Sequence, residues 1–458
     1  LQTSLRFSIP TDLVSINDAT PPSSSDSSSS PATFDLDNLN SVLAHRPHIV
    51  SLTVTSKPHT ATAEYLSSQV MCSIASFCKH LKELCFTAGP PTISSLKDLA
   101  AGSPGLVTLE LLQPQSLGCL PILAQFKSLQ ELYIRGQPED VVSCVSLHDD
   151  DLSLPSCYGS LNLVKLCFIN VRSNSGCDLS WLWRSCTSRL RNVEFLRCDD
   201  VASSMSAFVH CMPWLHEVKL CRCRAIAGRV LELVSEYSPE LRGLTVHDGA
   251  DTRCLLQVIQ KCRALEALDL RLPLDLSNED LMEIAQLGRQ FKSLRLHSCW
   301  LTTGADMRAL ASSITSDRLE ELALIKCRAI VQDSGGLSAL GQSVGGRLKI
   351  IDLSENEHLA EQGLAAMLAS CHAVRQLRLS KCGRLSDKVM EFIGNRCHHL
   401  ESMDIMRCEG VSTAGVSSLL KLQCCPNLKT LKVEPHKLTK DARKLASMKG
   451  VTLSIIND

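Results

Sequence analysis

Aromatic residues are scarce in this chain, because Phe, Trp and Tyr together make up 4% of its 458 residues. Proteins that bind single-stranded nucleic acid stack the bases on aromatic side chains, so we do not expect such a surface here. A surplus of either charge is also missing, since the formal net charge is −1. No global field therefore favours nucleic acid or an acidic membrane as a partner.

Long apolar runs are missing as well. No stretch approaches the roughly 20 apolar residues that cross a bilayer, so we expect no membrane association. The first residues, LQTSLRFSIPTDL, contain neither an initiator Met nor the apolar block of a secretory signal. We interpret this start as that of a fragment or a processed chain.

Sequence motifs of catalysis are scarce too. The chain contains no G-x-x-x-x-G-K-[ST], no H-E-x-x-H and no C-x-x-C pair, and GQSVG (341–345), which has the spacing G-x-S-x-G, lies within a Gly-rich helical pattern. The glycines of SGGLSALGQSVGG (334–346) are spread over a helical pattern and indicate helix ends and turns. We therefore expect a protein that is not an enzyme, with no catalytic residue and no cofactor.

Cysteine, by contrast, is abundant, with 23 residues. The number is odd and the chain is long and rich in Leu, whereas disulfide scaffolds are short and poor in core residues. Reduced thiols are therefore expected, which predicts a cytoplasmic or nuclear location or both. A free Cys is most often a small buried apolar residue.

An internal repeat organises the chain. The pattern L-x-x-L-x-L, often followed by x-x-C, recurs with its first apolar residue at steps of 24 to 29 residues. These first positions are Leu190, Leu215, Leu241, Leu265, Phe291, Leu319, Leu348, Val374, Leu400 and Leu428. Helical patterns lie between them, as in 385–397, where Val389, Met390, Ile393 and Cys397 share one face. Each unit is thus a strand and a helix that must stack on its neighbours to bury its apolar edge.

The predicted fold class is α/β, a leucine-rich-repeat solenoid (horseshoe) with a parallel β-sheet on the concave face and helices on the convex face. We expect two regions. Residues 1–33 form an N-terminal segment with a Ser/Pro-rich flexible linker (15–32), and residues 34–458 form a solenoid of about 15 repeats. A cluster of phosphorylation sites is the alternative reading of the linker.

One repeat is stretched, because 34 residues separate Leu129 from Leu163. The additional residues of this repeat (137–159) should protrude as a loop. The run His148 to Asp151 suggests metal ligands at first sight. Adjacent carboxylates do not converge on one ion without special backbone geometry, so a solvated acidic loop is favoured.

The cysteines fall into two columns that follow the repeat period. One column follows the strands and the other closes the helices. Their members are Cys198, Cys223, Cys299, Cys327, Cys382 and Cys408 in the first, and Cys78, Cys211, Cys262, Cys371, Cys397 and Cys425 in the second. Zinc needs four converging ligands, whereas a ladder of strands spaced roughly 5 Å apart supplies neighbours in a line. We therefore predict structural cysteines and no metal site, with the first column in the slot that Asn356 takes in its repeat.

Further features of these repeats leave alternatives open. Cys221 should face the concave surface, and the vicinal pair Cys424 and Cys425 could be reactive. Basic residues precede the column cysteines, namely Arg197, Arg222, Lys326, Lys381 and Arg407. They could form an anion-binding stripe, but a solvated rim is favoured because acidic residues lie nearby.

Alternating polar residues of the strands should line the concave face, a common docking surface of solenoids. We predict partner binding there, with a target protein as the partner. The candidate residues are Glu217, Lys219, Thr245, His247, Asp269, Arg271, Arg295, His297, Gln376, Arg378, Ser402 and Asp404.

Period, Leu positions and cysteine column together resemble the cysteine-containing leucine-rich repeat of plant-like F-box/LRR proteins, over roughly residues 34–458. The resemblance implies the substrate-recognition part of an SCF-type ubiquitin ligase, which directs target proteins to ubiquitination. The F-box, which binds a Skp-type adaptor and through it a cullin, is not found in this chain and is expected upstream if it exists. The alternatives are a non-ligase scaffold or regulatory module without an F-box, and a small-molecule ligand in the concave bowl, as in some plant relatives.

Overall fold

The computed structural model describes residues 4–9, 36–56, 64–113, 119–136, 160–172, 180–186, 188–199, 205–271, 277–298, 304–314, 317–327, 334–421 and 425–454. The chain divides into two compact units, Leu1–Ile226 and Ala227–Asp458. The expected linker (15–32), the stretched loop (137–159) with His148 to Asp151, Cys299 and Cys424 lie outside the described residues.

Strands and helices alternate along the first unit. Its strands are β1 (Ser4–Ile9), β2 (Ser51–Ser56), β3 (Glu83–Thr87), β4 (Thr108–Leu112), β5 (Glu131–Arg135), β6 (Lys165–Ile169), β7 (Asn192–Leu196) and β8 (Glu217–Cys221). Its helices are α1 (Leu36–Ala44), α2 (Glu64–Phe77), α3 (Ile93–Gly102), α4 (Cys119–Ile122), α5 (Ser180–Ser185) and α6 (Met205–Phe208), with the 3-10 turns η1 (Leu123–Gln125) and η4 (Met212–Trp214). The boundary between the units falls within α7 (Arg224–Tyr237).

The second unit repeats the same alternation. Its strands are β9 (Gly243–His247), β10 (Ala267–Arg271), β11 (Ser293–His297), β12 (Glu321–Ile325), β13 (Ile350–Asp352), β14 (Gln376–Arg378), β15 (Ser402–Asp404), β16 (Thr430–Lys432) and β17 (Thr452–Ser454). Its helices are α8 (Thr252–Lys261), α9 (Asn278–Leu287), α10 (Gly304–Ser313), α11 (Ser334–Val344), α12 (Glu361–Ala369), α13 (Asp387–Arg396), α14 (Thr413–Leu420) and α15 (Lys440–Lys449), with the 3-10 turns η6 (Gly345–Arg347) and η7 (Pro435–Lys437).

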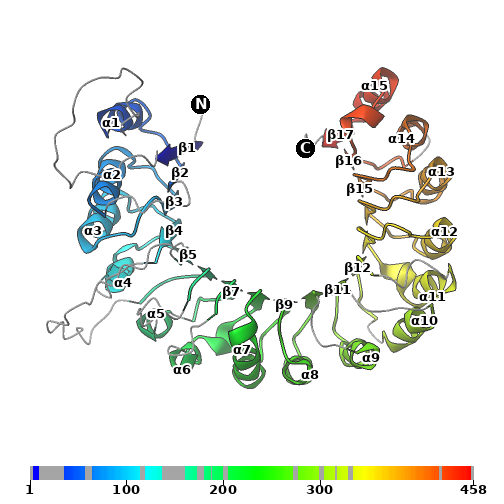
Figure 1. The fold of residues 1–458 in the computed structure, drawn as a ribbon, viewed down its shortest axis with the longest axis horizontal. Coiled ribbons are helices and arrows are strands. Elements are labelled where there is room, and N and C mark those ends of the chain that lie inside the picture. The colour runs from blue at the N-terminus through cyan, green and yellow to red at the C-terminus, as the bar shows by residue number, and fades with distance from the viewer. Residues whose placement is uncertain are drawn as a thin grey trace, which may run out of the picture. The chain divides into compact units, whose positions relative to one another are not determined.

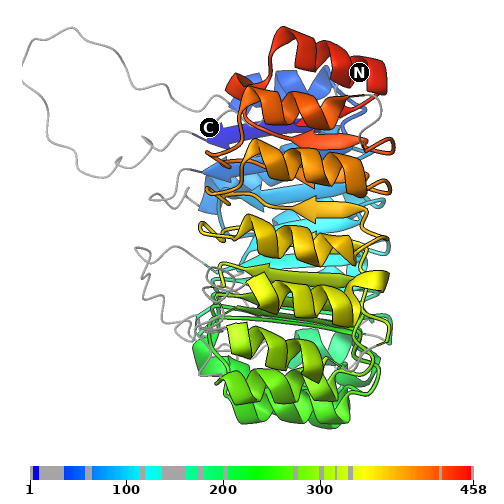
Figure 2. The same ribbon diagram turned by 90° about the vertical axis from the view of Figure 1, so that its right-hand side faces the viewer.

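Each strand pairs in parallel with the strand of the next repeat. This holds from β1 to β8 in the first unit and from β9 to β17 in the second. Within each unit the strands form the inner layer and the helices the outer layer (Figure 1). In the second unit the helices stack side by side in nearly the same direction (Figure 2). The predicted fold class, a leucine-rich-repeat solenoid, is confirmed.

One strand has no counterpart among the predicted repeats. β1 lies in the segment that we expected ahead of the solenoid, and its backbone pairs in parallel with β2 over six residues. Alternating apolar residues in SLRFSI suit a strand, but the motif L-x-x-L-x-L is incomplete there.

The repeated apolar positions form the core between the two layers. Every first-position residue from Leu190 to Leu428 is at most 3% exposed. In the first unit an aromatic cluster adds to this core, with Trp183 in contact with Phe168, Phe195 and Phe208 at ring-centre distances of 4.5 to 6.2 Å. The helix face predicted over 385–397 is buried as well.

The strand-following cysteines donate hydrogen bonds to backbone carbonyls. The thiol of Cys382 donates to the carbonyl of Leu353 at 3.2 Å, and that of Cys408 to Leu379 at 3.0 Å. Cys198, Cys223 and Cys327 make the same bond to Phe168, Phe195 and Leu296, each one repeat earlier. Asn356 occupies this slot in its repeat, since its Nδ2 donates to the carbonyl of Leu324 at 2.8 Å. The prediction that Cys and Asn share one structural slot is confirmed.

The residue before this slot has left-handed backbone geometry. Its φ lies between 54° and 63° in Asn170, Arg197, Arg222, Asp248, Ser298, Lys326, Glu355, Lys381 and Arg407. This region costs an L-residue about 1–2 kcal/mol. A hydrogen bond to the next repeat offsets the cost, because the amide of Lys381 donates to the carbonyl of Met406 at 2.7 Å. The basic side chains at these positions are exposed, as expected for a solvated rim.

The runs RLSDKVM (384–390) and GVSTAGV (410–416) suggest Ser386 and Ser412 as helix N-caps, and the structure shows a capping hydrogen bond for one of the two. The hydroxyl of Ser412 accepts a hydrogen bond from the amide of Ala414, as a cap should. Ser386 stands at the N-cap position of α13, but its side chain makes no capping hydrogen bond. Its backbone amide instead donates to the carboxylate of Glu361 in the preceding repeat.

We predict that Asn356→Ala destabilises the protein by several kcal/mol. Asn356 Oδ1 accepts from the amide of Cys327 at 2.8 Å, and Nδ2 donates to Leu324, Leu353 and Ser354. Each buried partner left unsatisfied costs about 1–3 kcal/mol. Asn356→Cys should recover part of this loss, because the thiol of Cys223 both accepts from the amide of Cys198 and donates to a carbonyl.

The measurement is equilibrium unfolding in urea followed by circular dichroism. Asn427→Ala is the control, since Asn427 makes one exposed bond to the carbonyl of His398 and should cost less than about 1 kcal/mol. Equal losses in Asn356→Ala and Asn427→Ala would contradict a structural role of the slot.

Candidate functional site

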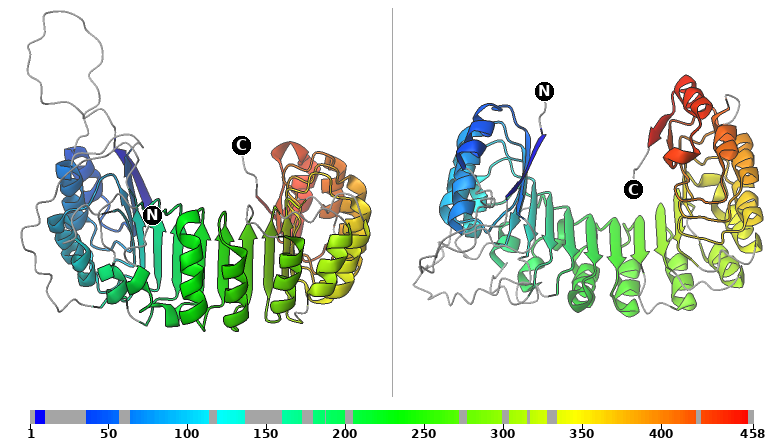
Figure 3. Two further views of the ribbon diagram at one scale, coloured as in Figure 1. Left: turned by 60° about the horizontal axis from the view of Figure 1, so that its bottom comes forward. Right: turned by 45° about the horizontal axis from the view of Figure 1, so that its top comes forward.

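The candidate residues lie on the strands as predicted. Glu217 and Lys219 are on β8 of the first unit, and the other ten are on β9, β10, β11, β14 and β15 of the second. They alternate with buried residues, so they lie on the face of the sheet away from the core. In Figure 3 the strands lie side by side, and in the described part of each unit no helix crosses this inner face. Cys221 also lies on it, at the end of β8.

In the first unit, Lys219 belongs to a network of paired charges. Its Nζ lies 2.9 Å from Oε1 of Glu194. The same oxygen lies 3.2 Å from Nζ of Lys165. Burial alone would raise the pKa of the Glu194 carboxyl, but the hydrogen bond and charge of Lys219 and the charge of Lys165 lower it. Glu217 lies beside this group, and its carboxylate accepts a hydrogen bond from the side-chain amide of Asn192 at 3.0 Å. Most of this charge is therefore neutralised within the sheet.

In the second unit, Arg295 lies at the centre of a larger network. Its guanidinium contacts Asp269 at 3.5 Å, Glu321 by a hydrogen bond and Asp352 at 3.5 Å. Asp352 also lies 3.5 Å from the guanidinium of Arg378 and is 6% exposed. Sequence reasoning missed Glu321 on β12 and Asp352 on β13, although both hold the same strand positions as predicted residues. The repeat register would have identified them.

His247, Asp269 and His297 are brought together by three adjacent strands. Nε2 of His247 lies 2.9 Å from Oδ1 of Asp269, and Nε2 of His297 lies 3.2 Å from the same oxygen. Burial alone would raise the pKa of Asp269, but the hydrogen bond with His247 and the close approach of both imidazoles hold it well below its usual value. These residue types can coordinate a metal ion. Among the described residues, no other group of His, Cys, Asp and Glu has this arrangement.

The remaining candidates are not gathered into this group. Thr245 and Arg271 lie beside it in register, and Arg271 is exposed. Gln376 and Ser402 lie on β14 and β15, farther along the sheet. Asp404 has a structural role, since its Oδ1 accepts the amide of Met406 at 3.1 Å, as Oδ1 of Asp352 accepts that of Ser354. A mutation of Asp404 would therefore disturb the fold as well as any partner binding.

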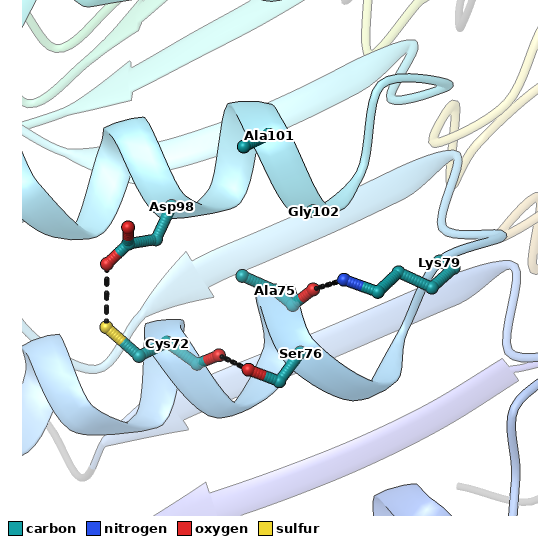
Figure 4. Close-up of a pocket in the computed structure, with 7 residues that line it drawn as sticks. All are labelled: Cys72, Ala75, Ser76, Lys79, Asp98, Ala101 and Gly102. Carbon is teal, nitrogen blue, oxygen red and sulfur yellow. Dashed lines mark hydrogen bonds between the residues drawn. The ribbon is translucent and has the colours of Figure 1, made fainter.

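A cavity on the outer layer of the first unit offers little chemistry. It measures about 300 Å³ and lies between α2 and α3, where Cys72 faces Asp98 (Figure 4). The thiol donates to Oδ2 of Asp98 at 3.2 Å, and burial, this bond and the negative charge all raise the pKa of Cys72. The ammonium of Lys79 is held by the carbonyl of Ala75 at 2.6 Å. A thiol with a raised pKa is a weak nucleophile.

The four buried cysteines of residues 371–408 are unsuited to chemistry for the same reason. Burial raises the pKa of Cys371, Cys382 and Cys397 to about 12 and that of Cys408 to about 11. His372, His398 and His399, which follow the helix-closing cysteines, are exposed to solvent. The cysteines and histidines of 371–408 thus belong to different layers of two successive repeats.

We predict that these four cysteines resist alkylation in the native protein. Their thiolate fraction at pH 7.5 is negligible and their side chains are buried, whereas Cys221 is partly exposed. Iodoacetamide labelling read by peptide mass spectrometry should modify Cys221 in the native protein and the four buried cysteines only in urea. Rapid native labelling of Cys382 or Cys408 would contradict this assignment.

No protein-family model matches the chain. Among solved structures, the chain is similar to a chain of the Rad7 and Elc1 complex in yeast, with 16% identity and a TM-score of 0.47 over 92% of this chain and 88% of that one. It is also similar to the leucine-rich repeat-containing protein LegL7 from Legionella pneumophila, with 15% identity and a TM-score of 0.42 over 58% of this chain and 89% of that one. At these identities the likeness concerns the fold alone. Within the described residues, no helix has the length and apolar character that a membrane crossing needs.

Proposed function

We propose that the chain is a binding module, not an enzyme, and that the inner face of its parallel strands recognises a protein partner. One observation carries this proposal: in each unit the inner face presents varied polar side chains that no described helix covers. Such faces are common docking surfaces of solenoid proteins. Exposed Arg271 and half-buried Arg378 are suited to contact acidic or polar groups of the partner.

We further propose that the partner is a target protein that an SCF-type ubiquitin ligase modifies. The support is the cysteine-containing repeat, which resembles that of F-box/LRR proteins in period, Leu positions and cysteine slot. In this role the repeats would hold the target, and an F-box would hold a Skp-type adaptor and cullin. The location proposed for this activity is the cytoplasm, the nucleus or both.

We predict that the double variant Gln376→Ala, Arg378→Ala loses its protein partners while keeping its fold. Both residues lie on the inner face of β14, and truncation to Ala removes their polar contacts without placing a new charge beside Asp352. Tagged wild-type and variant proteins would be expressed in cells of the source organism, cross-linked and compared by quantitative mass spectrometry. Target proteins should fall at least tenfold in the variant.

The matched control is Lys388→Ala, Glu391→Ala, two exposed residues on α13 of the neighbouring outer layer. It should retain every partner. Equal partner sets for all three proteins would rule out the inner face of β14. The same experiment on the longest product of the gene should recover a Skp-type adaptor and a cullin, and their absence would favour a non-ligase scaffold.

A further inference from the structure

Three side chains from consecutive repeats converge at one place on the inner face of the second unit. β10 lies between β9 and β11, and in the parallel register Arg271 pairs with both His247 and His297. Asp269 lies two residues earlier on β10, on the same face. The two imidazoles therefore approach the Asp269 carboxylate from either side, and their ring centres lie 5.5 Å apart.

The ligand atoms are spaced almost as a metal ion would hold them. All three lie within 4.8 Å of one another, and both nitrogen-to-oxygen distances are 2.9 to 3.2 Å. A tetrahedral ion with metal–ligand distances near 2.0–2.1 Å separates its ligand atoms by about 3.3 Å. The two nitrogen-to-oxygen distances therefore need to lengthen by only a few tenths of an ångström to admit an ion, and the two nitrogens lie no farther than 4.8 Å apart.

Two further observations favour a ligand at this place. Nε2 of His297 is buried and has no partner in hydrogen-bond geometry, although Oδ1 of Asp269 lies nearby. The other carboxylate oxygen, Oδ2, faces the guanidinium of Arg295 at 3.5 Å. Such a contact from outside the ligand set fixes the orientation of a metal-binding carboxylate.

We propose that His247, Asp269 and His297 bind a divalent transition-metal ion of the zinc class through Nε2, Oδ1 and Nε2. Two imidazoles and one carboxylate suit Zn²⁺, Co²⁺ or Fe²⁺. The fourth position must be filled from outside the trio, because no other described His, Cys, Asp or Glu belongs to the group. Water, or a donor atom of a molecule bound to the inner face, would take it. This inference does not depend on the proposed function.

The surrounding charges allow a cation here. The guanidinium of Arg295 is matched by Glu321 and Asp352 as well as Asp269, so it does not repel an ion as a free cation would. Arg271 opposes binding, because its exposed side chain stands between the two histidines in register. The alternative is a network of His–Asp hydrogen bonds and ion pairs without metal.

The test is titration of the chelator-treated protein with CoCl₂ and ZnCl₂, in a buffer that contains a phosphine reductant to keep the thiols reduced. We expect one ion per chain, the visible absorption of four-coordinate Co²⁺, and no thiolate-to-cobalt charge-transfer band. His247→Gln, His297→Gln should weaken binding by more than about 100-fold, because two of three ligands are lost. The amide side chains can still donate to Asp269, which helps to preserve the fold.

The control variant is His398→Gln, His399→Gln, an exposed pair that would account for adventitious surface binding. It should bind Co²⁺ as the wild type does. Asp269→Asn is the second test of the trio should the first variant unfold, as judged by circular dichroism without metal. Asp269→Asn should also weaken binding, since a neutral amide oxygen replaces the charged ligand.

Arg271→Gln supplies a test in the opposite direction. Removing this positive charge should tighten Co²⁺ binding severalfold, whereas binding elsewhere would be unaffected. The proposal is overturned by wild-type binding weaker than about 1 mM, by a thiolate band, or by unchanged affinity in the variants of the trio or in Arg271→Gln. Unchanged affinity in all variants would assign the ion to the cysteines or the surface.

Discussion

The turn that follows each strand is the constraint on which the rest of the structure depends. Parallel strands in successive repeats are joined by long connections, so nothing local fixes their register. The slot residue supplies this information by bonding back to the preceding strand, as the Cys382 thiol does to Leu353. The residue before it, held at positive φ, bonds forward, as the Lys381 amide does to Met406. Each such turn therefore joins three repeats, and where Cys or Asn occupies the slot a small buried donor lies at its centre.

A fixed register has a consequence on the opposite face of the sheet. Side chains at equal strand positions form rows across the repeats, about one strand spacing apart. Residues two repeats apart then flank the residue between them, which is how His247 and His297 come to face Asp269. The same rows bring Arg295 between acidic groups and hold Asp352 within reach of two guanidinium groups. The strand register thus determines which charged side chains meet on the inner face.

The sequence predicted what depends on periodicity and missed what depends on side-chain direction. Leu spacing defined the strands, the core and the cysteine slot, because each is repeated many times and every copy reinforces the others. Ser386 shows the limit, since a competing carboxylate from the preceding repeat bonds its amide and its hydroxyl makes no cap. The His–Asp–His trio is a second example. Its period of two repeats, 50 residues from His247 to His297, was visible, but convergence of the rings depends on rotamers.

The inner face serves both stability and recognition, and this limits which residues a partner can use. Asp352 and Asp404 accept backbone amides two residues later, so each ends its strand as well as contributing charge. Replacing either would loosen the turn that fixes the next repeat. Arg271 and Arg378 make no such backbone bond among those described, and they remain partly or fully open to solvent. Arginines of the inner face can therefore vary to suit a partner, whereas Asp352 and Asp404 are held by the fold.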